Sequence, residues 1–432
     1  MNIVKLVGVV ADDITGANDI GVMFANNGLR AIVVSLDDQP TAQDFTQADV
    51  LIINTGSRLL MADEAAEKSA LAARLLMGFG CDMIYTKTCS VFRGNIGATF
   101  DAVQDAAGVS CSMVVLGFPK NGRTTIGGIH YVYGKKLEET AFANDPVHPM
   151  NCSCLTRIIG RQSKRRCENF IAAFLDLPLE EQKAHLTELK KKAGYIVFDV
   201  RCQDDLAIIS RLIAKEKNIC GASALCEELP KAWGNAGPAQ KCRSFVLKDK
   251  PRGLVIFAGS MTPATTAQTE RLCALKTPFF ELEPAKLLKN ETCSDHLEQA
   301  REFLCREIRQ GHDALIMTSR KNVDCAAAGV TPAAAGRKIS EGFACLAAAV
   351  HHETGANRYL TLGGETSDAV RGALGIRAMR IYEEIDVGVP LMIGKCASGE
   401  EMLLVFKSGS FGSDDFLVRA IHKLNTLCGE TI

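Results

Sequence analysis

The sequence lacks the signals that would place it at once in a membrane, a secretory pathway or a nucleic-acid complex. No apolar run among its 432 residues reaches transmembrane length, and no basic segment followed by a long apolar one opens the chain. The formal net charge is -1, which gives no electrostatic reason to expect nucleic acid or an anionic membrane as a partner. We therefore expect a cytoplasmic protein without a membrane-spanning segment.

Paired metal-ligand patterns are also missing, although the chain contains 17 cysteines. The close pair Cys152 and Cys154 has no second pair to complete a zinc site. In a protein without a secretory signal the thiols should stay reduced, and most of them should serve as small core residues. The sequence therefore predicts no metal-ligating residue.

The common nucleotide-binding and phosphatase fingerprints are absent as well. The chain contains neither the Walker A pattern nor Gly-x-Gly-x-x-Gly, which disfavours a P-loop enzyme, a protein kinase and an ordinary Rossmann dehydrogenase. Haloacid-dehalogenase-type phosphatases carry a nucleophilic Asp two residues before a second Asp. Here Ala11 stands two residues before Asp13, which disfavours that class too.

The most informative stretch that is present lies near the start of the chain. Leu6–Ala11 is a β-branched apolar run typical of a buried strand, and a helical period begins at Ile14. Asp12 and Asp13 fall between the two, where ligands bind in open α/β sheets. Such carboxylates can accept bonds from hydroxyls or take a proton, although one polar residue of this turn could be only a helix N-cap.

Strands alternate with helices along the rest of the chain, among them expected strands over residues 50–54 and 112–117 and an expected helix over residues 62–77. This alternation predicts an α/β fold with mainly parallel sheets. The length favours two domains. A stretch rich in Pro, Gly and charges, residues 229–252, marks the boundary. We therefore expect an N-terminal domain over residues 1–245, a C-terminal domain over residues 252–432, and an active site in the cleft between them.

Charged and polar residues follow the predicted strands of the first domain. The topology should bring Asp12, Arg58, Lys87, Arg93 and Arg123 towards one rim. Single charges there could be solvated ion pairs, but the donors of residues 87–95 are harder to dismiss. Arginine binds carboxylates through two hydrogen bonds, so a small polyhydroxy acid would suit this rim.

Three Gly- and Ser-bearing turns follow predicted strands of the second domain. They are Gly259–Thr262, Gly363–Ser367 and Lys407–Gly412. Each turn alone is a weak signal, because strand-to-helix turns are often Gly-rich for steric reasons. Together they favour a nucleotide site built on helix N-termini.

Several motifs, in order along nearly the whole chain, resemble the four-carbon acid sugar kinase family. The motifs are Val10–Asp19, Phe92–Gly97, Gly122–Thr125, Ala258–Ser260, Gly363–Thr366 and Ser410–Ser413. The resemblance implies an ATP-dependent kinase that phosphorylates threonate, erythronate or 3-oxo-tetronate at the terminal hydroxyl. It also implies an acid-binding N-terminal domain and a nucleotide-binding C-terminal domain.

Site residues follow from the resemblance and from the strand ends. Those expected to bind the acid are Asp12, Arg58, Lys87, Phe92, Arg93, Gly94 and Asn95. Those expected to bind ATP are Ser260, Gly363, Gly364, Glu365, Thr366 and Gly409. Magnesium should be carried by the ATP phosphates. The proton acceptor is Asp12 or Asp13, and the sequence does not decide between them.

The sequence thus predicts an O4 kinase of a four-carbon sugar acid, with D-threonate or D-erythronate as the preferred substrate. The alternatives are a 3-oxo-tetronate 4-kinase, a dehydrogenase or isomerase on the same scaffold, and a non-enzymatic sugar-acid-binding protein. The expected partners are the acid and ATP. The oligomeric state stays open, with a homodimer as one assembly compatible with the sequence.

Overall fold

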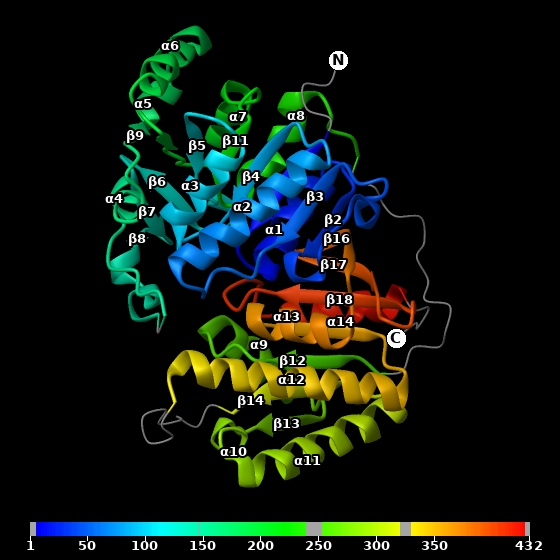
Figure 1. Ribbon diagram of the computed structural model, residues 1–432. Coiled ribbons are helices and arrows are strands. Elements are labelled where there is room, and N and C mark those ends of the chain that lie inside the picture. The colour runs from blue at the N-terminus through cyan, green and yellow to red at the C-terminus, as the bar shows by residue number, and fades with distance from the viewer. Residues whose placement is uncertain (1–5, 146, 239–252, 320–329, 428–432) are drawn as a thin grey trace. The chain divides into compact units, whose positions relative to one another are not determined.

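The computed structural model describes residues 6–145, 147–238, 253–319 and 330–427. The chain divides into two compact units, residues 1–240 and residues 241–432. Each unit contains a mainly parallel sheet with helical connections (Figure 1). The predicted α/β class is therefore confirmed.

The sheet of the first unit is parallel throughout its described strands. Their order across the sheet is β2 (Ala31–Ser35), β3 (Val50–Asn54), β1 (Val7–Ala11), β4 (Met83–Lys87), β11 (Asn218–Gly221), β5 (Ser112–Val115), β10 (Tyr195–Phe198) and β9 (Cys167–Phe170). Burial explains this arrangement, because β1, β3 and β4 are buried at every position and consist mostly of apolar residues.

The connections that follow β1 and its neighbours lead towards opposite edges of the sheet. After β1, helix α1 (Ile14–Ala25) leads to β2, whereas α2 (Ala62–Gly78) and α3 (Ile96–Ala106) lead the other way, to β4 and β5. Right-handed crossovers therefore place α1 on one face and α2 with α3 on the other. The carboxyl end of β1 consequently lies at the topological switch point, where open α/β sheets bind ligands.

The remaining elements of the first unit surround this sheet. A small antiparallel sheet consists of β6 (Arg123–Ile126), β7 (Ile129–Val132) and β8 (Lys135–Lys136). The further helices are α4 (Leu155–Gly160), α5 (Ala172–Leu175), α6 (Leu179–Lys190), α7 (Gln203–Leu212) and α8 (Leu229–Trp233).

The sheet of the second unit is parallel on one side and antiparallel on the other. Its order is β13 (Phe279–Leu282), β14 (Ala314–Thr318), β12 (Val255–Ala258), β15 (Arg358–Leu362), β18 (Glu401–Lys407), β17 (Val389–Lys395) and β16 (Ala378–Asp386). The first five strands in this order, which end with β18, pair in parallel. The last two, β17 and β16, complete the sheet as antiparallel strands.

Helices lie between most of these strands along the chain, and one more follows the last strand, β18. They are α9 (Pro263–Ala274), α10 (Pro284–Leu287), α11 (Asn290–Arg309), α12 (Pro332–Thr354), α13 (Gly364–Ala373) and α14 (Phe416–Leu427). Helix α9 leads from β12 to β13, whereas α12 leads from β14 across to β15. The carboxyl ends of β12 and β15 therefore flank the switch point of this sheet.

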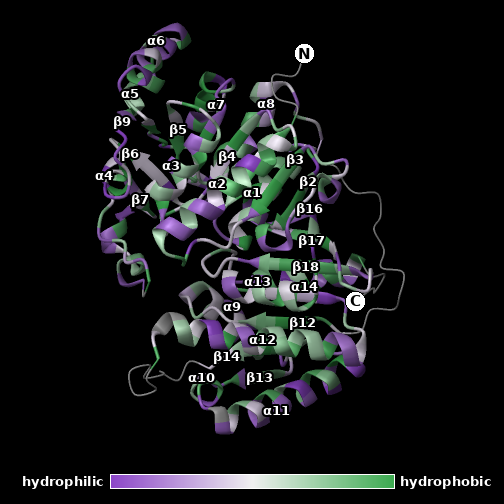
Figure 2. Ribbon diagram, viewed as in Figure 1, coloured by the Kyte–Doolittle hydropathy of each residue, from purple (hydrophilic) through white to green (hydrophobic). Residues whose placement is uncertain are grey.

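Apolar residues concentrate on the strands, and polar residues lie on the outward sides of the helices (Figure 2). In the first unit Phe24 of α1 stacks on Trp233 of α8, with ring centroids 6.3 Å apart. In the second unit the ring of Phe257 on β12 lies 5.3 Å from that of Phe343 on α12. None of the described helices combines the length and the apolar character needed to cross a bilayer.

Candidate functional site

Two carboxylates and one guanidinium form the centre of the candidate acid site in the first unit. Asp12 and Asp13 follow β1, and Arg58 lies in the turn after the neighbouring strand β3. Arg58 Nε and Nη2 lie 2.9 and 2.7 Å from the two carboxylate oxygens of Asp12, and Nη1 lies 2.5 Å from Oδ2 of Asp13. The strand ends thus bring Asp12 and Arg58 together, as the sequence predicted for this rim.

The two carboxylates differ in what else they bind. Asp13 is the N-cap of α1, with Oδ1 accepting from the amide of Gly16 at 2.7 Å and Oδ2 accepting from Thr15 Oγ1 at 2.8 Å. Burial alone would raise the pKa of Asp13, but the charges of Arg58 and Lys87 and these two bonds outweigh it and lower the pKa. Asp12 accepts side-chain bonds from Arg58 and caps no helix. The N-cap interpretation therefore applies to Asp13.

Lys87, the last residue of β4, lies beneath this pair. Its side chain is buried, with Nζ 3.1 Å from Oδ2 of Asp19 and 3.0 Å from the carbonyl oxygen of Thr88. A Cβ atom on Gly16 would lie only 2.5 Å from Asp13 Oδ1 and 3.3 Å from Lys87 Nζ. Glycine at this position therefore allows the charged groups to converge.

The turn before α3 supplies backbone geometry as well as side chains. Gly94 has φ of +111°, and a Cβ there would lie 3.4 Å from Arg58 Cγ. Asn95 Nδ2 donates to the carbonyl oxygen of Leu60 at 2.8 Å, which ties this turn to the one that carries Arg58. The ring of Phe92 is buried and packs edge-on against Phe100, so the sequence-predicted contact with a ligand would have to come from its backbone.

Phe92 also adopts a backbone conformation that bulky residues rarely take. Its φ is +58°, a left-handed value that costs free energy for a residue with a large side chain. The neighbouring Ser90 carbonyl is held by buried His130, whose Nε2 lies 2.9 Å away. Burial lowers the pKa of His130 to about 3, so its ring is neutral and its Nε2–H donates this bond.

Arg93 connects this turn to the loop whose sequence contains Pro146 and Pro149. Its Nη1 lies 2.8 Å from Oδ2 of Asp145, and its guanidinium lies over the ring of Phe142. The same loop brings His148 Nε2 to 2.9 Å from the carbonyl oxygen of Arg58. This loop therefore folds back onto the candidate acid site.

Some polar groups around this site lack protein partners. Among the described residues, the buried Nε of Arg93, Nε of Arg123, Oγ1 of Thr88 and both amide atoms of Asn18 make no hydrogen bond. Burial alone would raise the pKa of the Cys89 thiol, but the positive charges of Arg93 and Arg58 outweigh burial and lower the pKa. Buried polar atoms are nearly always satisfied, so water or ligand oxygens are expected at such positions.

The candidate nucleotide site lies in the second unit, at the carboxyl ends of adjacent strands. The amides of Gly259 and Ser260, after β12, donate to the carbonyl oxygen of Leu362 at 3.1 and 3.0 Å. A Cβ on Gly259 would lie 2.0 Å from Thr366 Oγ1, and Gly363 has φ of +129°. The turns after β12 and β15 are therefore packed together through their glycines.

The third turn, after β18, joins the same group. The carbonyl oxygen of Gly409 accepts from the hydroxyls of Thr262 and Thr265 at 2.5 and 3.0 Å. A Cβ on Gly409 would lie 2.3 Å from Ser260 Oγ. The sequence-predicted residues Ser260, Gly363, Thr366 and Gly409 thus lie in one place.

The two remaining predicted residues begin α13. Gly364 is its first residue, and Glu365 is an exposed acidic residue in its first turn. Helices α9 and α13 both begin at this cluster, so the positive ends of two helix dipoles meet the same region. Such an arrangement suits phosphate oxygens.

Lys407 supports this cluster from below and was not assigned a role from the sequence. It ends β18, is fully buried, and its Nζ lies 2.9 Å from the carbonyl oxygens of both Ser408 and Phe411. Burial lowers the pKa of Lys407 to about 7, while Asp386 acts in the opposite direction. The sequence signal that could have found it is a lysine directly after the apolar run Met402–Phe406.

Asp19 and Asp145 were also missed. Asp19 lies within the helical period of α1, where it looks like a solvated residue, yet it is buried against Lys87. Asp145 precedes the prolines of a loop whose path depends on tertiary structure. Neither contact has a signature in local sequence.

Comparison with known proteins covers both units. Residues 7–229 match a family model described as a sugar-binding N-terminal domain, and residues 255–417 match one described as a nucleotide-binding C-terminal domain. A 3-oxo-tetronate kinase of Methylobacterium radiotolerans is 32% identical, over 96% of this chain and 99% of that protein. One of Pseudomonas fluorescens is 30% identical over 97% of each chain, and a D-threonate kinase of Salmonella typhimurium is 28% identical over 98% and 99%.

Solved structures share the fold along nearly the whole chain. A Salmonella typhimurium LT2 protein superimposes with a TM-score of 0.80 at 27% identity, covering 96% of this chain and 98% of its own. A Haemophilus influenzae protein of the family DUF1537 gives a TM-score of 0.71 at 28% identity, with the same coverage.

Proposed function

Because the chain belongs to the four-carbon acid sugar kinase family, we propose that it transfers the terminal phosphoryl group of ATP to the O4 hydroxyl of a four-carbon sugar acid. The enzyme is a phosphotransferase with an alcohol group as acceptor. Phosphoryl transfer depends on positioning and charge neutralisation rather than on covalent chemistry by the protein. The proposal therefore needs one site for the acid, one for the phosphates, and a group that accepts the hydroxyl proton.

We assign the acid to residues 1–245 and the nucleotide to residues 252–432. The sugar-binding and nucleotide-binding family models that match the two halves support this assignment. So does the chemistry of each switch point. Carboxylates, arginines and a lysine gather at the first one, whereas glycines, hydroxyls and helix N-termini gather at the second.

Asp12 is our candidate for the proton acceptor. The single observation that carries the mechanism is the position of its carboxylate at the end of β1, held by Arg58. Both residues of the pair lie at the switch point, but Asp13 is occupied as the N-cap of α1 and its pKa is lowered. Asp12 keeps its oxygens for Arg58 and an incoming hydroxyl, and the Arg58 fork fixes its orientation.

Arg93 is our candidate for the carboxylate of the acid. Its Nε is a buried donor that makes no hydrogen bond with the described residues, and a carboxylate oxygen would satisfy it. Arg58, the other arginine expected to bind the acid, directs its guanidinium at Asp12 and Asp13. We therefore propose that Arg58 orients the carboxylate pair, and that Lys87 and Asn95 hold the surrounding turns.

ATP phosphates fit the cluster of Ser260, Gly363, Gly364, Thr366 and Gly409, whose donors are backbone amides and hydroxyls. Those donors suit phosphate oxygens, and the magnesium ion would arrive on the phosphates themselves. Glu365, in the first turn of α13, supplies an oxygen of the type that Mg²⁺ prefers. Magnesium would neutralise charge that develops on the transferred phosphoryl group.

D-Threonate or D-erythronate is the substrate that the sequence favours, and 3-oxo-tetronate is the alternative that the identities of the relatives favour. The 3-oxo-tetronate kinases cited above are 30% and 32% identical to the chain, against 28% for the D-threonate kinase. The three acids share the terminal hydroxyl and the carboxylate and differ at the inner carbons. A cytoplasmic location would supply the ATP that all of them require.

The test is ATP turnover by the purified chain against threonate, erythronate and 3-oxo-tetronate stereoisomers, with products located by phosphorus NMR. We expect phosphorylation at O4 of one of these acids and none of the corresponding neutral alcohols. Thermal stabilisation by an acid without ATP turnover would instead support a binding protein. Turnover of a larger neutral sugar but of no four-carbon acid would overturn the substrate assignment.

A further inference from the structure

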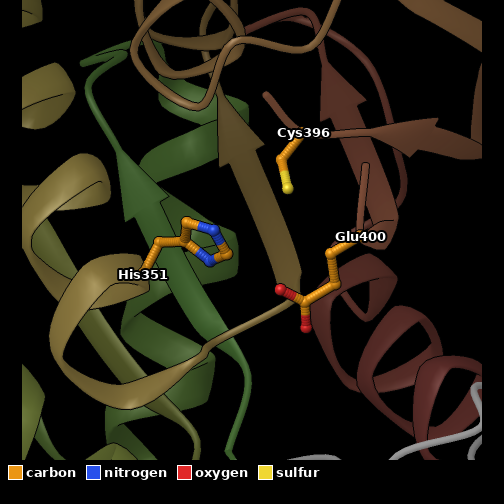
Figure 3. A group of neighbouring side chains, drawn as sticks. All are labelled: His351, Cys396 and Glu400. Carbon is orange, nitrogen blue, oxygen red and sulfur yellow. The ribbon is translucent and has the colours of Figure 1, made fainter. Parts of the chain in front are cut away.

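Three side chains of classes that ligate metals converge in the second unit, away from the nucleotide turns. His351 lies in the last turn of α12, and Cys396 and Glu400 lie in the connection between β17 and β18. One ligand atom of each, nitrogen, sulfur and oxygen, lies within 4.8 Å of the other two. Figure 3 shows the imidazole, thiol and carboxylate pointing towards a common space.

The imidazole is oriented as in a metal ligand. Nδ1 of His351 lies 2.9 Å from the carbonyl oxygen of Ala356, so Nδ1–H donates and the lone pair of Nε2 stays available. Metal-binding histidines usually donate their other ring N–H to a carbonyl or carboxylate in this way. Gly355, with φ of +68°, ends α12 and turns the chain so that residue 356 returns to the ring.

The other two ligands are held by one tight turn. The amide of Cys396 donates to the carbonyl oxygen of Glu400 at 3.0 Å, and the amide of Gly399 donates to that of Cys396 at 2.9 Å. Ser398 Oγ lies 2.9 Å from Cys396 Sγ, and its hydroxyl can donate to a thiolate. The turn therefore fixes the backbone from which both side chains extend, and Ser398 contacts the Cys396 sulfur.

The surroundings suit a small ion with access from solvent. Cys396 is 6% exposed, whereas His351 and Glu400 are partly exposed, which leaves a path for the ion and a position for a water molecule. Ligand atoms in a tetrahedral zinc site are roughly 3.5 Å apart, given bonds of about 2.0–2.3 Å. Small rotations of partly exposed side chains would close the cluster to that distance.

We propose that His351, Cys396 and Glu400 bind Zn²⁺, with water as the fourth ligand. A mixed nitrogen, sulfur and oxygen set matches zinc and excludes Mg²⁺ and Ca²⁺, which take oxygen ligands. Binding replaces the thiol proton with the metal and releases that proton. The inference does not depend on the proposed kinase activity.

The position in the sheet assigns the ion a structural role. Arg358 pairs with Leu403, so the amino ends of β15 and β18 lie side by side, and the cluster precedes both strands. The nucleotide turns follow the carboxyl ends of the same strands. Zinc would therefore join the end of α12 to the β17–β18 turn and stabilise the unit without touching the phosphates.

The test uses the full chain freed of metal by a chelator and then titrated with Zn²⁺. We expect one zinc per chain by elemental analysis and a rise of roughly 5–10 °C in the melting temperature at saturating zinc. Titration with Co²⁺ should produce the sulfur-to-cobalt charge-transfer absorption that reports a bound thiolate. Absence of stoichiometric zinc, or a cobalt spectrum without that absorption, would overturn the proposal.

Matched variants separate this site from the chain's other thiols. Cys396→Ser should lose the cobalt absorption and the zinc-dependent rise in melting temperature, whereas Cys345→Ser, at an exposed cysteine of the same helix as His351, should keep both. If Cys396→Ser does not fold, Glu400→Gln should weaken zinc binding at least tenfold. Retention of the cobalt absorption in Cys396→Ser, or unchanged zinc affinity in Glu400→Gln, would refute the assignment.

Discussion

Arg58 donates a hydrogen bond to each oxygen of the Asp12 carboxylate, with Nε 2.9 Å from Oδ2 and Nη2 2.7 Å from Oδ1. The two residues are 46 positions apart and meet because β1 and β3 are neighbours in register. A fork of two parallel bonds fixes the plane of the carboxylate as well as its position. Asp12 is thereby held in one orientation before substrate binds, which is the condition for an efficient proton acceptor.

We predict that Asp12→Asn lowers the turnover number by about 10²–10⁴-fold while leaving ATP binding nearly intact. An amide cannot accept the proton of the hydroxyl, but it keeps the shape of the side chain. Steady-state kinetics and calorimetric titration with an ATP analogue measure the two effects.

Asp13→Asn is the matched control, because asparagine caps helices about as well as aspartate. We expect a much smaller loss of turnover in this variant, since Asp13 serves α1 through the Gly16 amide. If the Asp12 variant kept wild-type turnover and the Asp13 variant lost it, the two roles would be exchanged.

Arg93→Ala should raise the Michaelis constant for the acid by about 10- to 150-fold, the cost of a lost charge-assisted bond of about 1.5–3 kcal/mol. The constant for ATP should change little. The variant should also discriminate less between the acid and its neutral alcohol. Arg30→Ala, which removes a partly exposed pair with Asp49, serves as control and should leave both constants unchanged. An undiminished preference for the acid would remove Arg93 from the carboxylate site.

Gly364→Val should weaken ATP binding while the fold is retained. A branched side chain at the first residue of α13 would occupy the space in which the backbone approaches a phosphate. Gly372→Val is the control in the same helix, because a Cβ at Gly372 meets no atom within 4 Å. Calorimetric titration with an ATP analogue compares the two. Equal affinities would mean that Gly364 is required only for the turn.

The sequence predicts the strands well because their burial leaves a strong local signal. The expected strand 50–54 coincides with β3, and the expected helix 62–77 differs from α2 by one residue at its end. Strand 112–117 was predicted too long, since β5 ends at Val115 where the chain leaves the ladder. Element ends depend on tertiary pairing, which local periodicity does not encode.

The residues of the candidate site also differ in whether the sequence could predict their position. Asp12, Arg58 and Lys87 could be placed together because parallel strands end at one edge. Their partners Asp19 and Asp145 could not, since one lies inside a helical period and the other in a loop. Phe92 illustrates the opposite kind of error. It was expected to bind the acid because it belongs to a motif, but its ring lies in the hydrophobic core. The grouping of His351, Cys396 and Glu400 could not be predicted from the sequence, because these residues lie on separate segments that the parallel pairing of β15 with β18 brings together.

Lys407 provides a prediction about pH. Its pKa is lowered by burial from 10.5 to about 7 in the folded protein, whereas the unfolded chain should keep the ordinary value. Between these two values the unfolded state holds a proton that the folded state has lost. The free energy of unfolding therefore gains a contribution that rises with pH from about 7 upwards and is absent below.

Lys407→Met should remove this contribution, because methionine fills the site without titrating. The variant should also bind ATP more weakly, since Nζ no longer holds the carbonyl oxygens of Ser408 and Phe411. Chemical unfolding of both proteins between pH 6 and pH 9 is the measurement, and groups common to both cancel in the difference. We expect the stability of wild type relative to the variant to be constant below about pH 7 and to increase above it. A difference that stayed flat, or fell as the pH rose, would show that the buried amine keeps its proton in the folded state.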